Sequence, residues 1–196
     1  MKNNLLSDKL AYNGDTKTRT HLHLCSYTVD RVEEAAGDDF GEMKSRFQPD
    51  GITWLQIHGL EDTDAVQTVC THFGIDFLVM QDILNTDHAS KVEEHDQYNV
   101  IIAKQIMGGE AMQVSLVQGA DFVLTFQERD NDFFDDVMRA IRNNVLKIRT
   151  RQSDYLFSVL LNGLITGYMS VAAAISDGLE ELESALLADT GDRDIG

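Results

Sequence analysis

The sequence has little proline, little cysteine and few basic residues, and each shortage excludes a class of protein. Pro49 is the one proline in 196 residues, and there is no proline-rich or other low-complexity segment. The two cysteines, Cys25 and Cys70, lie outside any C-x-x-C and are too few for a disulfide framework, which indicates a reducing compartment. Lysine and arginine number 16 against 33 acidic residues, and the net charge of -17 argues against nucleic acid and anionic membrane surfaces as partners.

Motifs of catalysis and secretion are also missing. There is no Walker loop, no G-x-S-x-G and no H-E-x-x-H, so we expect no enzyme activity. The opening "MKNNLLSDKLAYNGD" lacks an apolar stretch long enough for a signal peptide. The length suits one domain with a sizeable core, which we place at residues 20–196, after a loose leader over residues 1–19.

Apolar residues alternate in five segments, which predicts β-strands over 20–28, 51–60, 98–107, 111–119 and 120–128. The segment 51–60 is apolar on both faces, so we expect it inside the sheet. The "GGE" at 108–110 predicts a hairpin. Helices are predicted over 62–73, 75–85 and 131–150, the last of them capped by Asn131 or Asp132. This pattern predicts an α/β fold with a mixed sheet covered by helices.

Residues 155–176 carry no charge and contain a G-x-x-x-G at 163–167, which is typical of a membrane span. However, Ser158, Asn162, Thr166 and Ser170 form a polar stripe along one side of the helix, opposite an apolar stripe that includes Leu160. A helix in lipid would need partners for such polar groups. We therefore expect a long amphipathic helix that packs on the sheet or on other helices.

Three further clusters invite a functional interpretation. The acidic tail over 177–194 could gather cations, but a solvated helix end and turn is the favoured interpretation, as it is for "DRVEEAAGDDFGE" at 30–42. His21 and His23 share one face of a predicted strand, a spacing that can bind Zn²⁺. No further Cys, His or carboxylate stands at a sequence spacing that is typical of Zn²⁺ ligands, so we expect no Zn²⁺ site there.

Four segments in the middle of the chain resemble, in order, motifs of CorA-type divalent-cation transporters. They are "ITWLQIHGLEDTDAVQTVCTHFGIDFLVMQDILN", "SKVEEHDQYNVIIAKQIM", "VSLVQGADFVLTFQE" and "RQSDYLFSVLLNGLITGYM". Each segment alone is a weak signal, but four in the same order over about residues 50–170 are specific. The sequence is therefore similar to the N-terminal cytoplasmic domain of this family.

The resemblance implies a mixed sheet sandwiched between helical layers and ending in a long amphipathic helix. It also implies a role as the regulatory domain of a Mg²⁺ or Co²⁺ channel, which senses intracellular divalent cations and gates the pore. It further implies that the full-length protein is a homopentamer and that this domain lies at the cytoplasmic face of the membrane. The chain contains no Gly-Met-Asn pore signature, so we expect it to be truncated before the stalk and transmembrane helices.

The same resemblance implies a regulatory metal site. Asp82 matches the second acid of the family's acidic pair, and Asp87 is its nearest substitute, so both are predicted Mg²⁺ ligands. Mg²⁺ prefers oxygen ligands and keeps several waters, so one or two carboxylates suffice. Gln81, Asn162 and Thr166 stand where the family usually carries acids, which predicts a weakened or relocated site.

Two other functions remain open from the sequence. The first is a Zn²⁺ transporter of the same superfamily, since the segment that would select the ion is not in this sequence. The second is a free-standing acidic α/β interaction module that shares only the fold. The reading frame beyond Gly196 would separate the second from a transporter.

Overall fold

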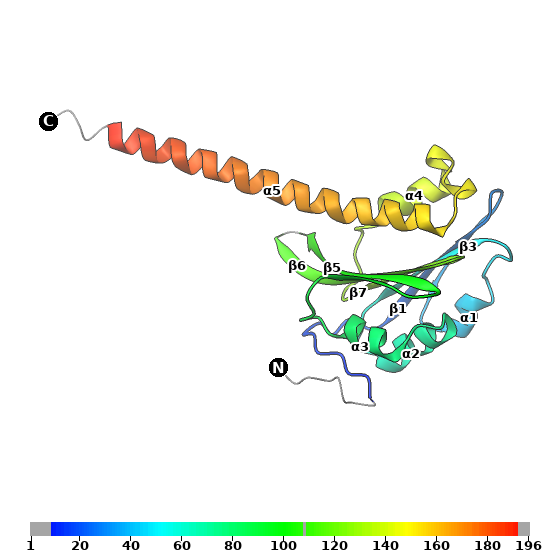
Figure 1. Ribbon diagram of the computed structural model, residues 1–196. Helices are drawn as coiled ribbons and strands as arrows, with labels where there is room; N and C mark the ends of the chain where they lie inside the picture. The colour runs from blue at the N-terminus through cyan, green and yellow to red at the C-terminus, as the bar shows by residue number, and fades with distance from the viewer. Residues whose placement is uncertain (1–8, 108, 192–196) are drawn as a thin grey trace.

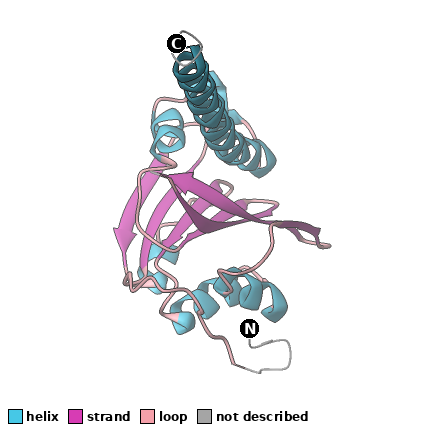
Figure 2. Cartoon of the chain, turned by 90° about the vertical axis from the view of Figure 1, so that its left-hand side faces the viewer, coloured by secondary structure: helices cyan, strands magenta, loops and turns pink. Residues whose placement is uncertain are grey.

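The computed structural model describes residues 9–107 and 109–191 and shows a mixed sheet between two helical layers. Figure 1 shows α1, α2 and α3 on one face of the sheet and α4 and α5 on the other, and Figure 2 shows the same layers from the side. The predicted α/β sandwich is confirmed. The elements in chain order are β1 (His21–Tyr27), β2 (Val32–Gly37), α1 (Phe40–Lys44), β3 (Ile52–His58), α2 (Thr63–His72), α3 (Phe77–Leu84), β4 (Lys91–Glu94), β5 (Tyr98–Met107), β6 (Glu110–Gly119), β7 (Phe122–Gln127), α4 (Asp135–Arg142), the 3₁₀ helix η2 (Val145–Thr150) and α5 (Ser153–Gly191).

The seven strands lie in the order β2-β1-β3-β7-β6-β5-β4. Only β3 and β7 run parallel, with Trp54 opposite Val123, and the other neighbours are antiparallel. Strand β3 is thus an inner strand, as its two apolar faces predicted. The predicted hairpin is confirmed because Met107 pairs with Glu110, although Gly108 itself lies outside the described residues.

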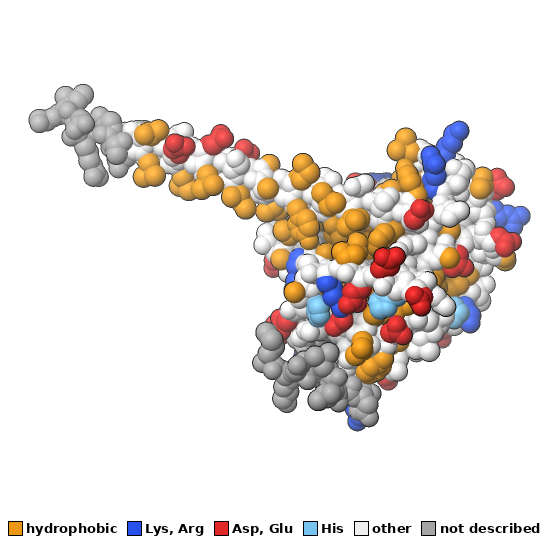
Figure 3. Space-filling model, viewed as in Figure 1, with side chains coloured by type: hydrophobic (Ala, Val, Ile, Leu, Met, Phe, Trp, Pro, Cys, Tyr) orange, Lys and Arg blue, Asp and Glu red, His pale blue; other side chains and the backbone are white. Residues whose placement is uncertain are grey.

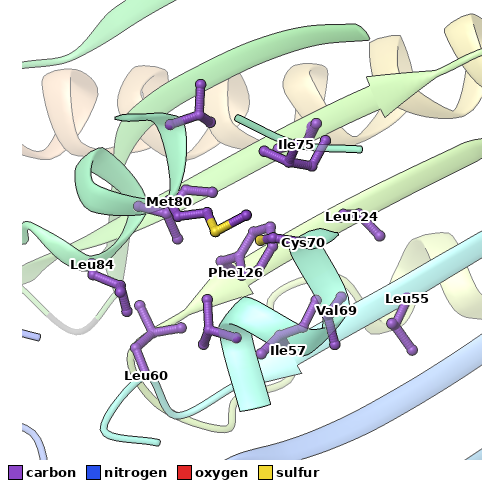
Figure 4. Close-up of a cluster of buried hydrophobic side chains, with 14 of the residues drawn as sticks. Leu55, Ile57, Leu60, Val69, Cys70, Ile75, Met80, Leu84, Leu124 and Phe126 are labelled. Atoms are coloured by element: carbon purple, nitrogen blue, oxygen red, sulfur yellow. The ribbon is translucent and has the colours of Figure 1, made fainter. Parts of the chain in front are cut away.

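The sheet separates two hydrophobic cores. Leu55 and Ile57 of β3 point to the α1–α3 side, where they meet side chains of α2, α3 and β7 (Figure 4). Trp54 points to the opposite side and packs with Phe134 and the first turns of α5. Burial of apolar side chains on both faces is the main stabilising contribution to such a fold.

The prediction of a solvated helix end and turn at 30–42 is wrong. Val32–Gly37 form the edge strand β2 on β1, and Asp39 caps α1 by accepting a hydrogen bond from the Glu42 backbone N–H at 2.9 Å. Edge strands tolerate charged side chains because one side of the strand faces water. The acidic residues of β2 therefore gave no apolar alternation from which a strand could be predicted. The four-residue strand β4 at the opposite edge was not predicted either.

The prediction of one helix over 131–150 is also wrong. Helix α4 begins after Phe134, not after Asn131 or Asp132, and it ends at Arg142. Asn144 has φ 51° and ψ 40°, the left-handed conformation that asparagine tolerates and that ends a helix. The chain continues as η2, in which Val145 is exposed.

Helix α5 packs on the sheet only through its first half. Leu156, Leu160 and Leu164 are buried, and the Tyr168 hydroxyl donates a hydrogen bond to the backbone carbonyl of Lys104. Beyond this point α5 leaves the body of the protein (Figure 1), and Leu182 is 62% exposed. The predicted packing therefore holds for the first half of α5 and is wrong for the second half, because the whole helix has 39 residues, about 58 Å, and its second half extends past the sheet.

The acidic tail continues α5 without a turn as far as Gly191, so the turn predicted within the described part of the tail is absent. Asp192 and Asp194 lie outside the described residues. By length and composition, Ser153–Leu187 meet the requirement for a membrane-spanning helix. The first turns of this segment nevertheless pack in the hydrophobic core on one face of the sheet.

The described part of the predicted leader, residues 9–19, contains no helix or strand but is attached to the body. The Tyr12 hydroxyl donates a hydrogen bond to Oε2 of Glu128 at 3.0 Å, and burial together with this carboxylate raises the pKa of Tyr12 to about 12. Asn13 accepts a hydrogen bond from the Thr86 backbone N–H at 2.7 Å. The first eight residues lie outside the described part of the chain.

Candidate metal sites

Asp82 lies on α3, whose apolar residues Val79, Met80 and Ile83 face the core. The carboxylate of Asp82 sits on the remaining side of the helix and reaches toward β4, and its side chain is 22% exposed. Nζ of Lys91 lies 2.6 Å from one carboxylate oxygen, and Nε2 of His88 lies 3.3 Å from the other. Asp82 is therefore already paired with a cation of its own chain.

Lys91, the first residue of β4, holds a second carboxylate as well. Its Nζ lies 2.8 Å from Oε1 of Glu93, so one ammonium group joins two acids. Partial burial lowers the pKa of Lys91, but the hydrogen bonds to Asp82 and Glu93 outweigh that effect and raise it above its usual value. The hydrogen bond from Lys91 lowers the pKa of Glu93.

The charged groups continue along the edge of the sheet. His95 lies 3.6 Å from Glu93 through Nε2 and 3.6 Å from Asp76 through Nδ1, and it stacks on the Tyr98 ring. Figure 3 shows acidic, histidine and basic side chains gathered below the base of α5. Three carboxylates against one ammonium make this stretch negative, a field that attracts cations. We name it the β4 row, and it consists of Asp76, Asp82, His88, Lys91, Glu93 and His95.

Asp87 lies in the segment between α3 and β4, beside a groove of about 760 Å³. Its Oδ2 is 3.5 Å from Nδ2 of Asn13, a long hydrogen bond. Glu128 in the same groove is engaged by Tyr12 and by the backbone N–H of Gln113. Among the residues that the structure describes, neither Asp82 nor Asp87 belongs to a group of three His, Cys, Asp or Glu side chains with close ligand atoms.

The positions that depart from the family pattern lie on two elements. Asn162 and Thr166 are on the exposed side of α5, and Gln81 is half-buried on α3, directly before Asp82. None of the three carries a charge that would compensate a metal ion. Of the two adjacent positions that correspond to the family's acidic pair, Gln81 is neutral and Asp82 carries the charge.

The sequence did not reveal one cluster that the fold assembles. His23 was expected to have no partner other than His21, but His58 and Asp130 lie next to it, with ligand atoms of all three within 4.8 Å of one another. His58 stands 35 positions after His23, and Asp130 a further 72. No spacing rule for metal sites covers such separations, so only the strand order could have shown the cluster.

The fold has relatives among solved structures. One is described as the complete structure of the CorA magnesium transporter from Methanocaldococcus jannaschii, with a TM-score of 0.61 and 19% identity over 85% of this chain and 51% of that one. Another is the ZntB cytoplasmic domain from Vibrio parahaemolyticus, with a TM-score of 0.58 and 10% identity over 82% of this chain and 64% of that one. The architecture is therefore that of the soluble domains of these proteins.

Sequence comparison identifies the family. The profile of a family described as CorA-like Mg²⁺ transporter protein matches residues 49–196. The cobalt/magnesium transport protein CorA of Thermotoga maritima is 32% identical over 192 residues, which cover 95% of this chain and 55% of that protein. The chain belongs to the CorA family of divalent-cation transporters, and it spans about half the length of this curated relative.

Proposed function

We propose that this chain is the cytoplasmic regulatory part of a CorA-like transporter of Mg²⁺, with Co²⁺ as a second ion, and that it senses divalent cations to gate the pore. Membership of the family, the net charge of -17 and a helix that leaves the body of the domain support this function. The domain lies at the cytoplasmic face of the membrane in this proposal.

The regulatory cation binds at Asp82, and it does so by displacing Lys91. The observation that carries this step is the bridge in which Nζ of Lys91 lies 2.6 Å from Asp82 and 2.8 Å from Glu93. Two carboxylates close enough to share one ammonium group are close enough to share one hydrated Mg²⁺, which is commonly held by one or two carboxylates and several waters. Competition with Lys91 makes the affinity lower than two uncompensated acids would give.

Asp87 is a subsidiary ligand in this proposal. It stands beside a groove whose lining also includes Asp15, so a hydrated cation would meet a second acid there, while Glu110 in the same lining is paired with Arg129 at 3.1 Å. Asn13 donates only a long hydrogen bond to Asp87, and the carboxylate is therefore easily released. Removal of Asp87 should weaken binding less than removal of Asp82.

The complete protein is a homopentamer in this proposal, and α5 supplies part of its contacts. Ile175, Leu179 and Leu182 are 59%, 61% and 62% exposed on the half of α5 that leaves the body, and Figure 3 shows such apolar side chains along the helix. Apolar side chains repeated along one helix favour association with a partner of similar surface.

The test is calorimetric titration of the full-length protein with Mg²⁺. Asp82→Asn should weaken binding about tenfold or more, which corresponds to about 1.4 kcal/mol or more, while Asp87→Asn should have a smaller effect. Asp64→Asn on α2 is a matched control, since that acid lies outside the β4 row. Equal affinities for the Asp82 variant and the control would exclude the assignment.

Ion fluxes distinguish the proposed Mg²⁺ transporter from the alternative Zn²⁺ transporter. Uptake of Mg²⁺ or Co²⁺ by cells that express the complete reading frame supports the proposal, whereas uptake of Zn²⁺ alone supports a Zn²⁺ transporter. Uptake that responds to intracellular Mg²⁺ in the parent protein but not in Asp82→Asn would assign the gating role. No uptake of any of these ions would favour an interaction module.

A further inference from the structure

The sheet brings three potential metal ligands to one end of adjacent strands. His23 lies on β1, His58 is the last residue of β3, and Asp130 follows β7 by three residues. Because β1, β3 and β7 are neighbours and β3 and β7 run parallel, the ends of β3 and β7 reach the same edge. His21 also lies nearby, but its Nδ1 is 2.6 Å from Asp38 and is engaged there.

The three side chains converge on Asp130. Its Oδ1 lies 2.7 Å from Nδ1 of His58 and 4.0 Å from Nε2 of His23, and the two imidazole centroids are 5.0 Å apart. Four ligands placed tetrahedrally about 2.0 Å from Zn²⁺ are about 3.3 Å from one another. The two distances to Asp130 each differ from that value by less than about 1 Å, and the third pair of ligand atoms, which lie within 4.8 Å of each other, would approach by up to about 1.5 Å.

The surroundings leave these groups ready to coordinate. Nε2 of His23 is buried and has no hydrogen-bond partner among the described residues, and Nδ1 of His58 is held 2.7 Å from Oδ1 of Asp130. Burial disfavours the charged imidazole and lowers the pKa of His23 and of His58. The side chain of His58 is 3% exposed and provides a fixed ligand, whereas the Asp130 side chain is 61% exposed and can move.

We propose that His23, His58 and Asp130 form a binding site for a divalent transition-metal cation of the Zn²⁺ class. Two imidazoles and one carboxylate suit Zn²⁺, Co²⁺ and Ni²⁺, whereas Mg²⁺ prefers oxygen ligands alone. The exposed side of the site leaves a fourth position for water. The site is separate from the β4 row, since the two share no residue and lie toward different edges of the sheet.

The site would also support α5. Asp130 lies in the loop between β7 and α4. The Phe133 ring in that loop lies against Gly163 and Gly167 of α5, 3.8–3.9 Å from where a Cβ would stand. Asn131 in the same loop accepts a hydrogen bond from Gln127 of β7 at 3.0 Å. A cation held by Asp130 therefore fixes the loop between the sheet and the base of the long helix.

The test uses the 196-residue chain without a polyhistidine tag, stripped with a chelator and titrated with Zn²⁺ in a calorimeter at pH 7. We expect one high-affinity site, a rise in melting temperature with Zn²⁺, and binding at least tenfold weaker in His23→Gln and in Asp130→Asn. These two side chains are partly exposed, so their variants should fold, which circular dichroism would check. Titration of the same variants with Mg²⁺ should show no change.

Histidine variants elsewhere distinguish this site from other Zn²⁺ binding. His88→Gln and His95→Gln remove imidazoles of the β4 row and should leave the high-affinity Zn²⁺ site intact. The proposal is overturned if Zn²⁺ binds His23→Gln as tightly as the parent chain, if it binds none of these proteins, or if only the β4-row variants lose it. Since Mg²⁺ regulation rests on Asp82, failure of either proposal leaves the other standing.

Discussion

The ammonium nitrogen of Lys91 lies 2.6 Å from Oδ2 of Asp82, and both side chains are about four-fifths buried. The carboxylate that the sequence predicts as a Mg²⁺ ligand is thus paired with a lysine nine residues further along the chain. The pair is a charge-assisted hydrogen bond of the stronger kind, because it is short and largely shielded from water. Any cation that binds Asp82 competes with this lysine.

Removal of that lysine should therefore strengthen cation binding. Lys91→Met keeps most of the apolar stem but leaves Asp82 and Glu93 without the ammonium group that they share. We expect Mg²⁺ to bind this variant about tenfold more tightly, which is a gain of about 1.4 kcal/mol in binding free energy. Calorimetry measures the change. Lys44→Met is the control, since Lys44 is exposed in the last turn of α1, outside the β4 row and outside the groove beside Asp87. An unchanged affinity in Lys91→Met would show that the lysine does not occupy the cation position.

The same bridge should make the fold sensitive to acid. The hydrogen bond from Lys91 lowers the pKa of Glu93 below its ordinary 4.5, so this group stabilises the fold fully above pH 4.5. That contribution disappears as the pH falls from 4.5 through the pKa of the folded state, because the unfolded chain then binds the proton more tightly. Urea unfolding between pH 7 and pH 3 should show the loss in the parent chain and a smaller loss in Lys91→Met.

The two halves of α5 should respond differently to truncation of leucine. Leu160 is fully buried, so Leu160→Ala should lower the free energy of unfolding by about 2–5 kcal/mol. Leu182 is 62% exposed, and Leu182→Ala should change it by less than about 0.5 kcal/mol. Chemical denaturation of the separate variants measures both. Similar losses would mean that the second half of the helix is packed in solution.

Two glycines offer a test of the backbone. Gly59 has φ 79°, and a Cβ there would lie 2.4 Å from the carbonyl oxygen of Thr18, so Gly59→Ala should destabilise the fold by more than about 1 kcal/mol. Gly178 lies within α5 with nothing within 4 Å of an added Cβ, and Gly178→Ala should stabilise the helix by about 0.5–1 kcal/mol. Thermal melts would show opposite shifts. If Gly59→Ala left the melting temperature unchanged, residues 18–19 would not pack on this turn.

The inner part of the fold followed from the sequence because buried strands carry a strong periodic pattern. Apolar faces on both sides identified β3, and the same alternation identified β1 and β5 to β7. The edge strands β2 and β4 were not predicted, because charged residues are depleted in strands and give a poor signal for one. These strands contain Glu33, Glu34, Glu93 and Glu94. The break after α4 depends on Asn144 in a left-handed conformation, which propensity alone does not require.

The candidate sites were less predictable than the fold, because charge pairing depends on how elements face one another. Asp82 could be named from a motif, but its pairing with Lys91 depends on how α3 packs beside β4. His58 and Asp130 are 72 residues apart and meet only because β3 and β7 are parallel neighbours. Sequence spacing reveals metal sites within one element or turn, and both sites here are assembled between elements.

The anchoring of α5 at one end gives it mechanical leverage. The buried leucines and the Tyr168 hydrogen bond fix the helix on the sheet, and residues 168–191 extend beyond that support by about 36 Å. A tilt of about 5° at the support would move the far end by about 3 Å, because a regular helix of this length behaves as a nearly rigid rod. Small rearrangements of the loop at Phe133, which touches the helix near its support, would therefore be magnified at its tip.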